Sequence, residues 1–123
     1  MNDDRLWEFE RELWTGPAEA YDEKVGKDVV MALPASPFLY DNQAATKAVK
    51  DTPRWDSVDF TDTRVERHQE GLIVIAYRAR AKGGERTYDA LCTSTLLRLD
   101  HEEWVVIQHQ QTPLGVEVAD PNG

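Results

Sequence analysis

The N-terminal segment has the clearest hydrophobic pattern in the chain, and the pattern is helical. Winding residues 5–14 at about 100° per residue gathers the apolar side chains into one continuous arc, made of Leu6, Trp7, Phe9, Leu13 and Trp14. Charged side chains fill the opposite side, as expected of an amphipathic helix. Glu10 is the exception, because it falls inside the apolar arc.

A carboxylate at this position needs compensation. Burial of an unpaired carboxylate costs free energy, so Glu10 must be neutralised, hydrogen-bonded or exposed to a wet cavity. Two interpretations follow. Glu10 is either a structural residue tied to a backbone amide, an indole or a tyrosine, or a general acid/base or ligand anchor. Structural networks perturb carboxylates as active sites do, so both interpretations stay open.

The rest of the first half predicts two further helices and one short strand. Gly16 ends the first helix, and a second helix runs to about Lys24. Residues 29–33 form a short apolar run, which predicts a buried strand followed by a proline-rich loop. Asp41 can then cap a third helix that ends before Pro53.

The second half of the chain predicts strands. Apolar and alternating runs place them at residues 55–60, 63–69, 72–81, 86–99 and 103–111. The Gly-Gly pair within Lys82–Glu85 predicts a hairpin turn. Helices followed by strands indicate an α+β domain, in which three N-terminal helices pack on one antiparallel sheet. This domain spans residues 1–114, and residues 115–123 are expected to form a frayed tail.

Alternation along the strands predicts which side chains face the helices. In the strand at residues 72–81, Tyr77 points inward, whereas Arg78 and Arg80 point outward. The inward face of the next strand carries Ala90, Cys92 and Ser94 after Tyr88. Small side chains at these positions leave space, and that space predicts a pocket.

The last strand is apolar on both faces. Alternation places Gln108 and Gln110 on the cavity side and His109 on the other side, with Val105 and Ile107. A sheet that is apolar on both faces needs cover on both. Because three helices cover only one face, we expect a second protomer to cover the other.

Composition bounds the class of protein. The chain has 123 residues, enough for one domain with a substantial core. Its 23 acidic and 14 basic side chains give a net charge of −9, which disfavours nucleic acid and anionic membranes as partners. The single Cys92 cannot form an internal disulfide, and no run resembles a membrane span or signal peptide. A cytoplasmic protein fits best.

Candidate chemistry beyond Glu10 is sparse. The three histidines have no metal-ligand spacing with one another or with Cys92, so no metal site is expected. His109 is ambiguous: near a strand end it could be a general base, but its phase places it at the expected dimer interface. The four tryptophans suit a core, and aromatic walls with a few polar groups also suit a small-molecule pocket.

At this point the sequence resembles a known family. The resemblance is carried by Leu6–Glu10, Leu13–Gly16, Tyr21, Val30, Met31, Pro34, Pro53–Trp55, Ala76–Arg78, Tyr88, Ala90, Leu91, Trp104 and His109–Leu114. These residues look like the small bacterial nuclear transport factor 2-like proteins of the SnoaL-like and ketosteroid-isomerase-like superfamily.

The resemblance implies a cystatin-like cone, with a curved antiparallel sheet wrapped around the helices, a central cavity and frequent dimerisation through the sheet. Members of the superfamily include isomerases, cyclases, dehydratases, ligand binders and association domains. No catalytic residue carries over by motif. Where a ketosteroid isomerase-like site has a carboxylate, the last strand has Gln108, His109 and Gln110.

The sequence therefore predicts a homodimeric α+β cone that binds a small, largely apolar molecule without a cofactor. The expected cavity residues are Trp7, Glu10, Trp14, Tyr21, Tyr77, Gln108 and Gln110. In an enzyme, Glu10 would transfer the proton and Tyr21 or Tyr77 would donate to a developing oxyanion. The alternative is a non-catalytic dimerisation or stress-associated module whose cavity is incidental.

Overall fold

Three helices and six strands make up most of residues 1–115, the part of the chain that the computed structural model describes. In chain order they are α1 (Asp3–Thr15), α2 (Ala18–Lys24), β1 (Val25–Ala32), β2 (Leu39–Tyr40), α3 (Asn42–Asp51), β3 (Ser57–Gln69), β4 (Leu72–Gly83), β5 (Arg86–Asp100) and β6 (Glu103–Pro113). The helices come from the first half and the long strands from the second, which confirms the predicted α+β class.

Side-chain caps fix the start of the two longer helices. The Asn2 side chain accepts a hydrogen bond from the backbone N–H of Arg5 at 2.9 Å and begins α1. Asp41 accepts from the N–H of Ala44 at 2.8 Å and begins α3. Each cap satisfies a backbone donor that the first turn leaves unpaired. The predicted cap at Asp41 is therefore confirmed.

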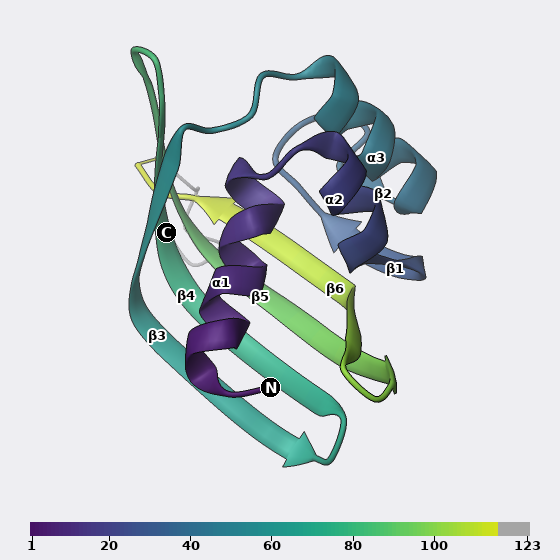
Figure 1. Cartoon of the computed structure of the whole chain (residues 1–123). Helices are drawn as coiled ribbons and strands as arrows, with labels where there is room; N and C mark the ends of the chain where they lie inside the picture. Colours follow the sequence, from purple (N-terminus) through teal and green to yellow (C-terminus); the bar gives the residue numbers. More distant parts are fainter. Residues whose placement is uncertain (116–123) are drawn as a thin grey trace, which may run out of the picture.

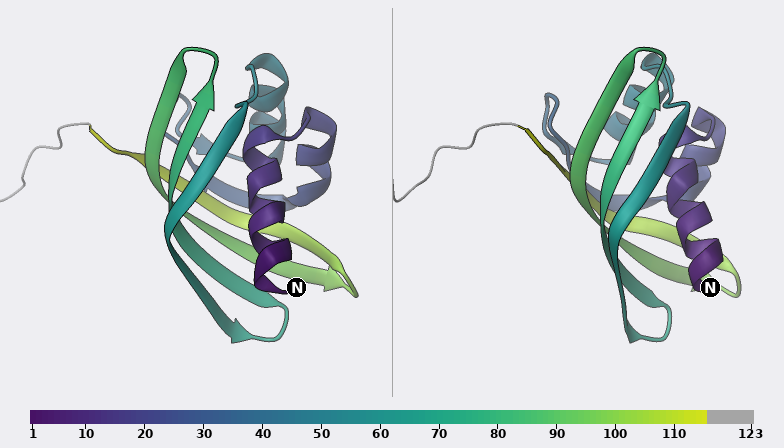
Figure 2. Two further views of the ribbon diagram at one scale, coloured as in Figure 1. Left: turned by 60° about the vertical axis from the view of Figure 1, so that its left-hand side comes forward. Right: turned by 90° about the vertical axis from the view of Figure 1, so that its left-hand side faces the viewer.

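The six strands form one curved sheet in the order β2-β1-β6-β5-β4-β3. Neighbouring strands are antiparallel except β1 and β6, which are parallel. The expectation of a purely antiparallel sheet is wrong at this pair, because no hairpin joins the two strands and fixes their direction. Helix α1 lies against the concave side of the sheet, and α2 and α3 lie near β1 and β2 (Figure 1 and Figure 2).

Strand β3 replaces two predicted strands. Residues 55–60 and 63–69 were separate in the prediction, but Ser57–Gln69 is one strand paired with β4. Its register shifts between Thr61 and Arg64, and Asp62 has a positive φ of 52° there. Such a bulge bends a strand without ending it, which explains why the alternation breaks in the sequence.

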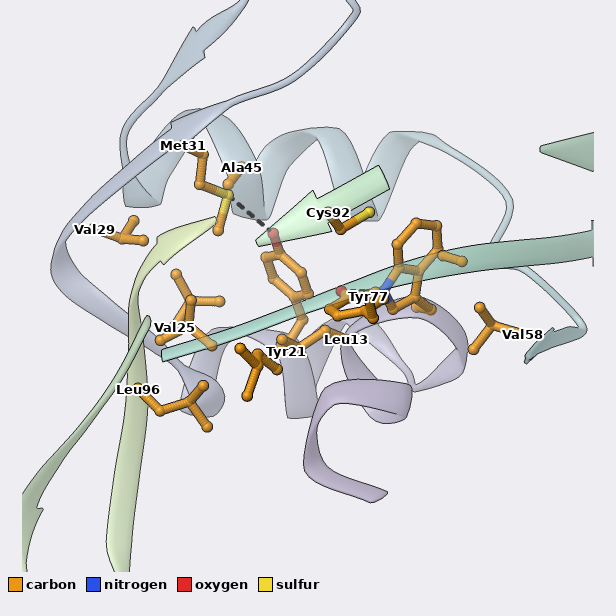
Figure 3. Packing of buried hydrophobic residues seen from close by; sticks show 14 of the residues in the cluster. Leu13, Tyr21, Val25, Val29, Met31, Ala45, Val58, Tyr77, Cys92 and Leu96 are labelled. Atoms are coloured by element: carbon orange, nitrogen blue, oxygen red, sulfur yellow. Dashed lines mark hydrogen bonds between the residues drawn. The ribbon is translucent and has the colours of Figure 1, made fainter. Parts of the chain in front are cut away.

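The concave side of the sheet carries the core. Ile73, Ile75, Tyr77 and Ala79 of β4 are buried, as are Ala90, Cys92, Ser94 and Leu96 of β5, so the predicted phase of these two strands is confirmed. Figure 3 shows Tyr21 of α2 among these side chains, with its hydroxyl directed at the sulfur of Met31, 3.5 Å away. The helices and the concave face thus share one apolar interior.

Strand β6 contains a bulge that reverses its predicted phase. Leu96 of β5 pairs with Val106, whereas the preceding Thr95 pairs with Gln108, so Ile107 is the extra residue. Because side chains alternate with a period of two, one extra residue moves every later side chain to the other face. The prediction that Gln108 and Gln110 line the cavity is therefore wrong.

The same bulge turns His109 toward the interior. His109 is buried and lies beside Ser94 of β5. Of the two alternatives left open for His109, the one that placed it at a dimer interface is therefore wrong. Gln108 and Gln110 instead bond the hydroxyls of Thr93 and Thr95 on the convex side. These glutamines and threonines form a neutral polar band across β5 and β6.

Within residues 1–115, no helix is both long and apolar enough to cross a membrane. Gly115 is the last residue that the structure describes, so most of the predicted tail at residues 115–123 lies outside the described residues and stays a prediction.

Candidate functional site

A cavity of about 340 Å³ opens between the helices and the concave side of the sheet. Its walls are mostly apolar, with contributions from Leu13, Trp14, Met31, Leu33, Val49 and Trp55. The polar side chains in the walls include Tyr21, Arg54, Tyr88, His109 and Gln111. An apolar pocket with a few convergent polar groups is typical of small-molecule sites.

Glu10 lies behind this cavity and is fully buried, with 0% of its surface exposed. Its Oε2 accepts a hydrogen bond from the Tyr77 hydroxyl at 2.5 Å and is 2.6 Å from the Ser94 hydroxyl. The Trp14 indole N–H donates in turn to the Tyr77 hydroxyl at 3.2 Å. Within residues 1–115, Oε1 has no hydrogen-bond partner. One carboxyl oxygen thus joins α1 to β4 and β5.

The network continues from Ser94 to the cavity. The Ser94 hydroxyl is 2.7 Å from Nδ1 of His109, and Nε2 of His109 is 3.0 Å from the side-chain amide nitrogen of Gln111. The Tyr88 hydroxyl donates to the amide oxygen of Gln111 at 3.1 Å. A continuous chain of hydrogen bonds therefore runs from buried Glu10 to side chains in the cavity wall.

This chain of hydrogen bonds has two self-consistent proton arrangements. When Glu10 is ionised, Ser94 donates to Oε2, His109 Nδ1–H donates to Ser94, and Nε2 accepts from the Gln111 amide. When Glu10 is protonated, Oε2–H donates to Ser94 and Ser94 donates to Nδ1. Nε2 then carries the hydrogen, and Gln111 presents its amide oxygen. The two differ by one proton: relay of a proton from Glu10 through Ser94 to Nδ1 of His109 gives the first arrangement only when Nε2 also releases its hydrogen and the Gln111 amide turns over.

Burial shifts the pKa values of the groups in this chain of hydrogen bonds. Loss of solvation raises the pKa of Glu10, and the hydrogen bonds from Ser94 and Tyr77 oppose that shift without cancelling it. Burial also lowers the pKa of His109 to about 4, against a smaller opposing effect of the Thr93 backbone. Nδ1 of His109 is 3.8 Å from Oε2 of Glu10, so a neutral imidazole offers that carboxyl no counter-charge.

The structure places the predicted site residues in four locations. Trp14 and Tyr21 lie in the cavity wall. Glu10 and Tyr77 lie deeper. Trp7 is half-buried outside the cavity, and its ring packs edge-on against Tyr77 with centroids 5.6 Å apart. Gln108 and Gln110 lie on the convex face of the sheet, as described above.

The predicted site lacked several residues of the cavity and its hydrogen-bond network, among them Tyr88, Ser94, His109, Gln111 and Arg54. Ser94 was predicted to face inward, but its hydroxyl was counted as a small side chain rather than as a partner for Glu10. His109 and Gln111 were hidden by the bulge. Arg54 is far in sequence from the helix it contacts, so no local pattern points to it. In residues 1–115 no cluster of His, Cys, Asp and Glu could hold a metal ion.

Known protein families and curated proteins give no match. No protein-family model fits this chain, and no curated protein matches it.

Solved structures do match the fold of this chain. A protein from Parabacteroides distasonis, described as a candidate ketosteroid isomerase, has a TM-score of 0.75 at 18% identity, covering 89% of this chain and 86% of its own.

Two further structures agree with that match. A nuclear transport factor 2-like protein from Cytophaga hutchinsonii has a TM-score of 0.74 at 18% identity, over 93% of this chain and all 100% of its own. A nuclear transport factor 2-like protein of unknown function in nutrient uptake, from Rhodospirillum rubrum, has a TM-score of 0.72 at 16% identity, over 91% and 94%. The chain therefore has the nuclear transport factor 2-like fold, which confirms the fold that the sequence resemblance implied.

Replacing Glu10 with Gln should change how stability depends on pH. Because the pKa of Glu10 is raised above its ordinary 4.5, its stabilising contribution is complete below about pH 4.5 and is lost as pH rises toward the folded-state pKa. Gln keeps the shape of the protonated acid and cannot ionise. In urea unfolding, the free energy of unfolding of Glu10→Gln should therefore rise relative to that of the parent by about 1.4 kcal/mol per pH unit above pH 4.5.

The control is Glu8→Gln, an exposed site on the same helix. It should shift the free energy of unfolding by no more than about 0.5 kcal/mol, as surface substitutions usually do. His109 titrates in Glu8→Gln as it does in the parent, so it cancels from that difference. A constant difference between Glu10→Gln and the parent across about pH 4.5 to 6.5 would contradict a raised pKa at Glu10.

Proposed function

We propose that the chain binds a small, largely apolar molecule in its cavity and transfers a proton to or from that molecule. The observation that carries the proposal is the position of His109, which lines the cavity and also contacts Ser94 next to Glu10. A side chain in the cavity wall thus has a direct hydrogen-bonded connection to a buried acid.

In the proposed route, Glu10, Ser94 and His109 each pass on one proton. The proton of Glu10 Oε2 moves to Ser94 Oγ, the Ser94 hydroxyl proton moves to Nδ1 of His109, and the Nε2 proton of His109 moves to a basic atom of the ligand. Glu10 then holds the negative charge until the reverse transfer restores its proton. Positioned acids and bases of this kind contribute about 10²- to 10⁴-fold to rates.

Tyr21 is proposed as the hydrogen-bond donor to the ligand. It lines the cavity, and burial raises its pKa to about 12, so it keeps its proton. Within residues 1–115 the Tyr21 hydroxyl donates to the sulfur of Met31 alone, which is a weak acceptor. An oxygen of the ligand would be the better partner, and it would stabilise negative charge that develops there.

A second proposal concerns assembly. The convex face carries exposed apolar side chains, including Leu39 at 73%, Val30 at 63% and Leu91 at 47% exposure. Between them lie the neutral threonines and glutamines described above, so two copies of this acidic chain would not repel one another there. We propose that this face forms a symmetric homodimer interface. In the non-catalytic alternative, this association alone is the function.

The proton-transfer proposal predicts isotope exchange in bound ligands. Cyclic ketones, phenols and aromatic acids would be screened by thermal shift, and those that bind would be incubated with the protein in D₂O. Binding should raise the melting temperature of the parent, and the parent should introduce deuterium at an acidic C–H of at least one ligand. Mass spectrometry measures the exchange, and no knowledge of the product is needed.

Glu10→Gln and His109→Asn should each slow that exchange by about 10²-fold or more, while ligand affinity changes much less. Glu8→Gln is the control and should behave as the parent does. Binding without exchange would leave a ligand-binding protein and remove the catalytic proposal. Failure of every compound to bind would contradict the cavity proposal for this range of chemistry.

Leu91→Glu should separate the proposed dimer, because each copy would bury an uncompensated carboxylate in the interface. Light scattering should give a dimeric mass for the parent and a monomeric mass for Leu91→Glu at micromolar concentration. Gln43→Glu adds the same charge at an exposed site on α3 and should remain dimeric. A monomeric parent would contradict the assembly proposal.

A further inference from the structure

We infer that the ligand carries a carboxylate and that Arg54 binds it. The inference rests on the proposed function, because it assigns a chemical class to the molecule in the same cavity.

The charge of the cavity wall is the first observation. Although the chain has 23 acidic residues and a net charge of −9, no Asp or Glu among residues 1–115 lines the cavity. Of the described side chains in its walls, Arg54 alone has a full charge at neutral pH. The cavity is therefore electropositive within an acidic protein, and such a field favours anionic ligands.

The second observation is that Arg54 is held in place without being neutralised. Its Nε donates to the Gly16 carbonyl at 2.8 Å, and its Nη2 donates to the Leu13 carbonyl at the end of α1. Its guanidinium carbon is 5.6 Å from the centroid of the Tyr21 ring. These contacts fix the direction of the guanidinium group and cap α1, but carbonyl oxygens and an aromatic ring leave its unit charge in place.

No counter-ion for Arg54 is found in the part of the chain that the structure describes. Among residues 1–115, no carboxylate oxygen lies within 4 Å of its nitrogens, and Nη1 makes no hydrogen bond. Tyr21 and Tyr88 do not supply negative charge, because burial raises the pKa of each to about 12. Two of the five N–H donors of Arg54 are in use, so three remain for a ligand.

A carboxylate on an apolar body fits these features. Charge-assisted hydrogen bonds between a guanidinium and a carboxylate are about twice as strong as neutral ones, and the aromatic and aliphatic walls suit the rest of the molecule. The cavity volume of about 340 Å³ equals that of about eleven water molecules at about 30 Å³ each. An aromatic ring with a short acid side chain is therefore of suitable size.

The test compares an acid with its neutral analogue. Phenylacetate and phenylacetamide would be titrated into the parent, Arg54→Gln, Arg54→Lys and Arg64→Gln, with affinities measured by calorimetry or NMR. The parent should bind phenylacetate about tenfold or more tightly than phenylacetamide, as expected of a charged hydrogen bond. Arg54→Gln should lose that preference while its affinity for phenylacetamide stays within about twofold of the parent's.

The remaining variants separate charge from folding. Arg54→Lys keeps the charge and should keep part of the preference, whereas Arg64→Gln removes an exposed arginine of β3 and should behave as the parent does. The preference of the parent for phenylacetate over phenylacetamide is measured without any variant, so it tests the carboxylate assignment even if Arg54→Gln fails to fold. Equal binding of acid and amide would overturn the carboxylate assignment and leave the cavity proposal standing. Absence of binding by both would overturn both.

Discussion

A single carboxyl group, placed in the core without a counter-charge, governs the organisation of this site. Oε2 of Glu10 bonds the hydroxyls of Tyr77 and Ser94, and no cation among residues 1–115 pairs with it. Loss of water outweighs the hydrogen bonds from these hydroxyls, so the pKa of Glu10 is raised toward the protonated form. When Glu10 is protonated and donates to Ser94, that donation orients the Ser94 hydroxyl and the tautomer of His109, while Tyr77 donates to Oε2.

The bulge at Ile107 gives this carboxyl its connection to the cavity. Without the extra residue, His109 would lie on the convex face with Val105 and would reach neither Ser94 nor the cavity. With it, Nδ1 of His109 comes within 2.7 Å of the Ser94 hydroxyl. Bulges often re-aim side chains next to functional sites. Here the bulge places His109 and Gln111 on the concave side of the sheet, where the sequence predicted Gln108 and Gln110.

Local patterns in the sequence predicted most of the fold, because local physics sets those features. The apolar arc of α1 placed Glu10 in the core, Asp41 marked the start of α3, and the Gly-Gly pair after Lys82 marked a hairpin. Alternation in β4 and β5 was reliable because their pairing shows no register shift. The resemblance to nuclear transport factor 2-like proteins added the curvature of the sheet, which no local pattern contains.

The parts that could not be predicted depend on partners far apart in the sequence. The parallel pairing of β1 with β6 is set by how the whole sheet closes on the helices, and the bulge is set by the register between β5 and β6. Arg54 caps α1 from 38 residues beyond Gly16, a contact that exists only in the folded chain. The burial of Glu10, Trp14 and Tyr21 was therefore predicted correctly, whereas the faces of the side chains along β6 were predicted wrongly.

The protonation state of Glu10 can be measured through the imidazole ring next to it. Nitrogen NMR of ¹⁵N-labelled histidine distinguishes the two neutral tautomers, and exposed His68 and His101 provide internal references. A protonated Glu10 donates through Ser94 to Nδ1, so His109 should be neutral near pH 7 with its hydrogen on Nε2, and its pKa should lie at about 4. A hydrogen on Nδ1, or a pKa of His109 near its ordinary 6.5, would contradict the account of a buried neutral acid connected to the cavity.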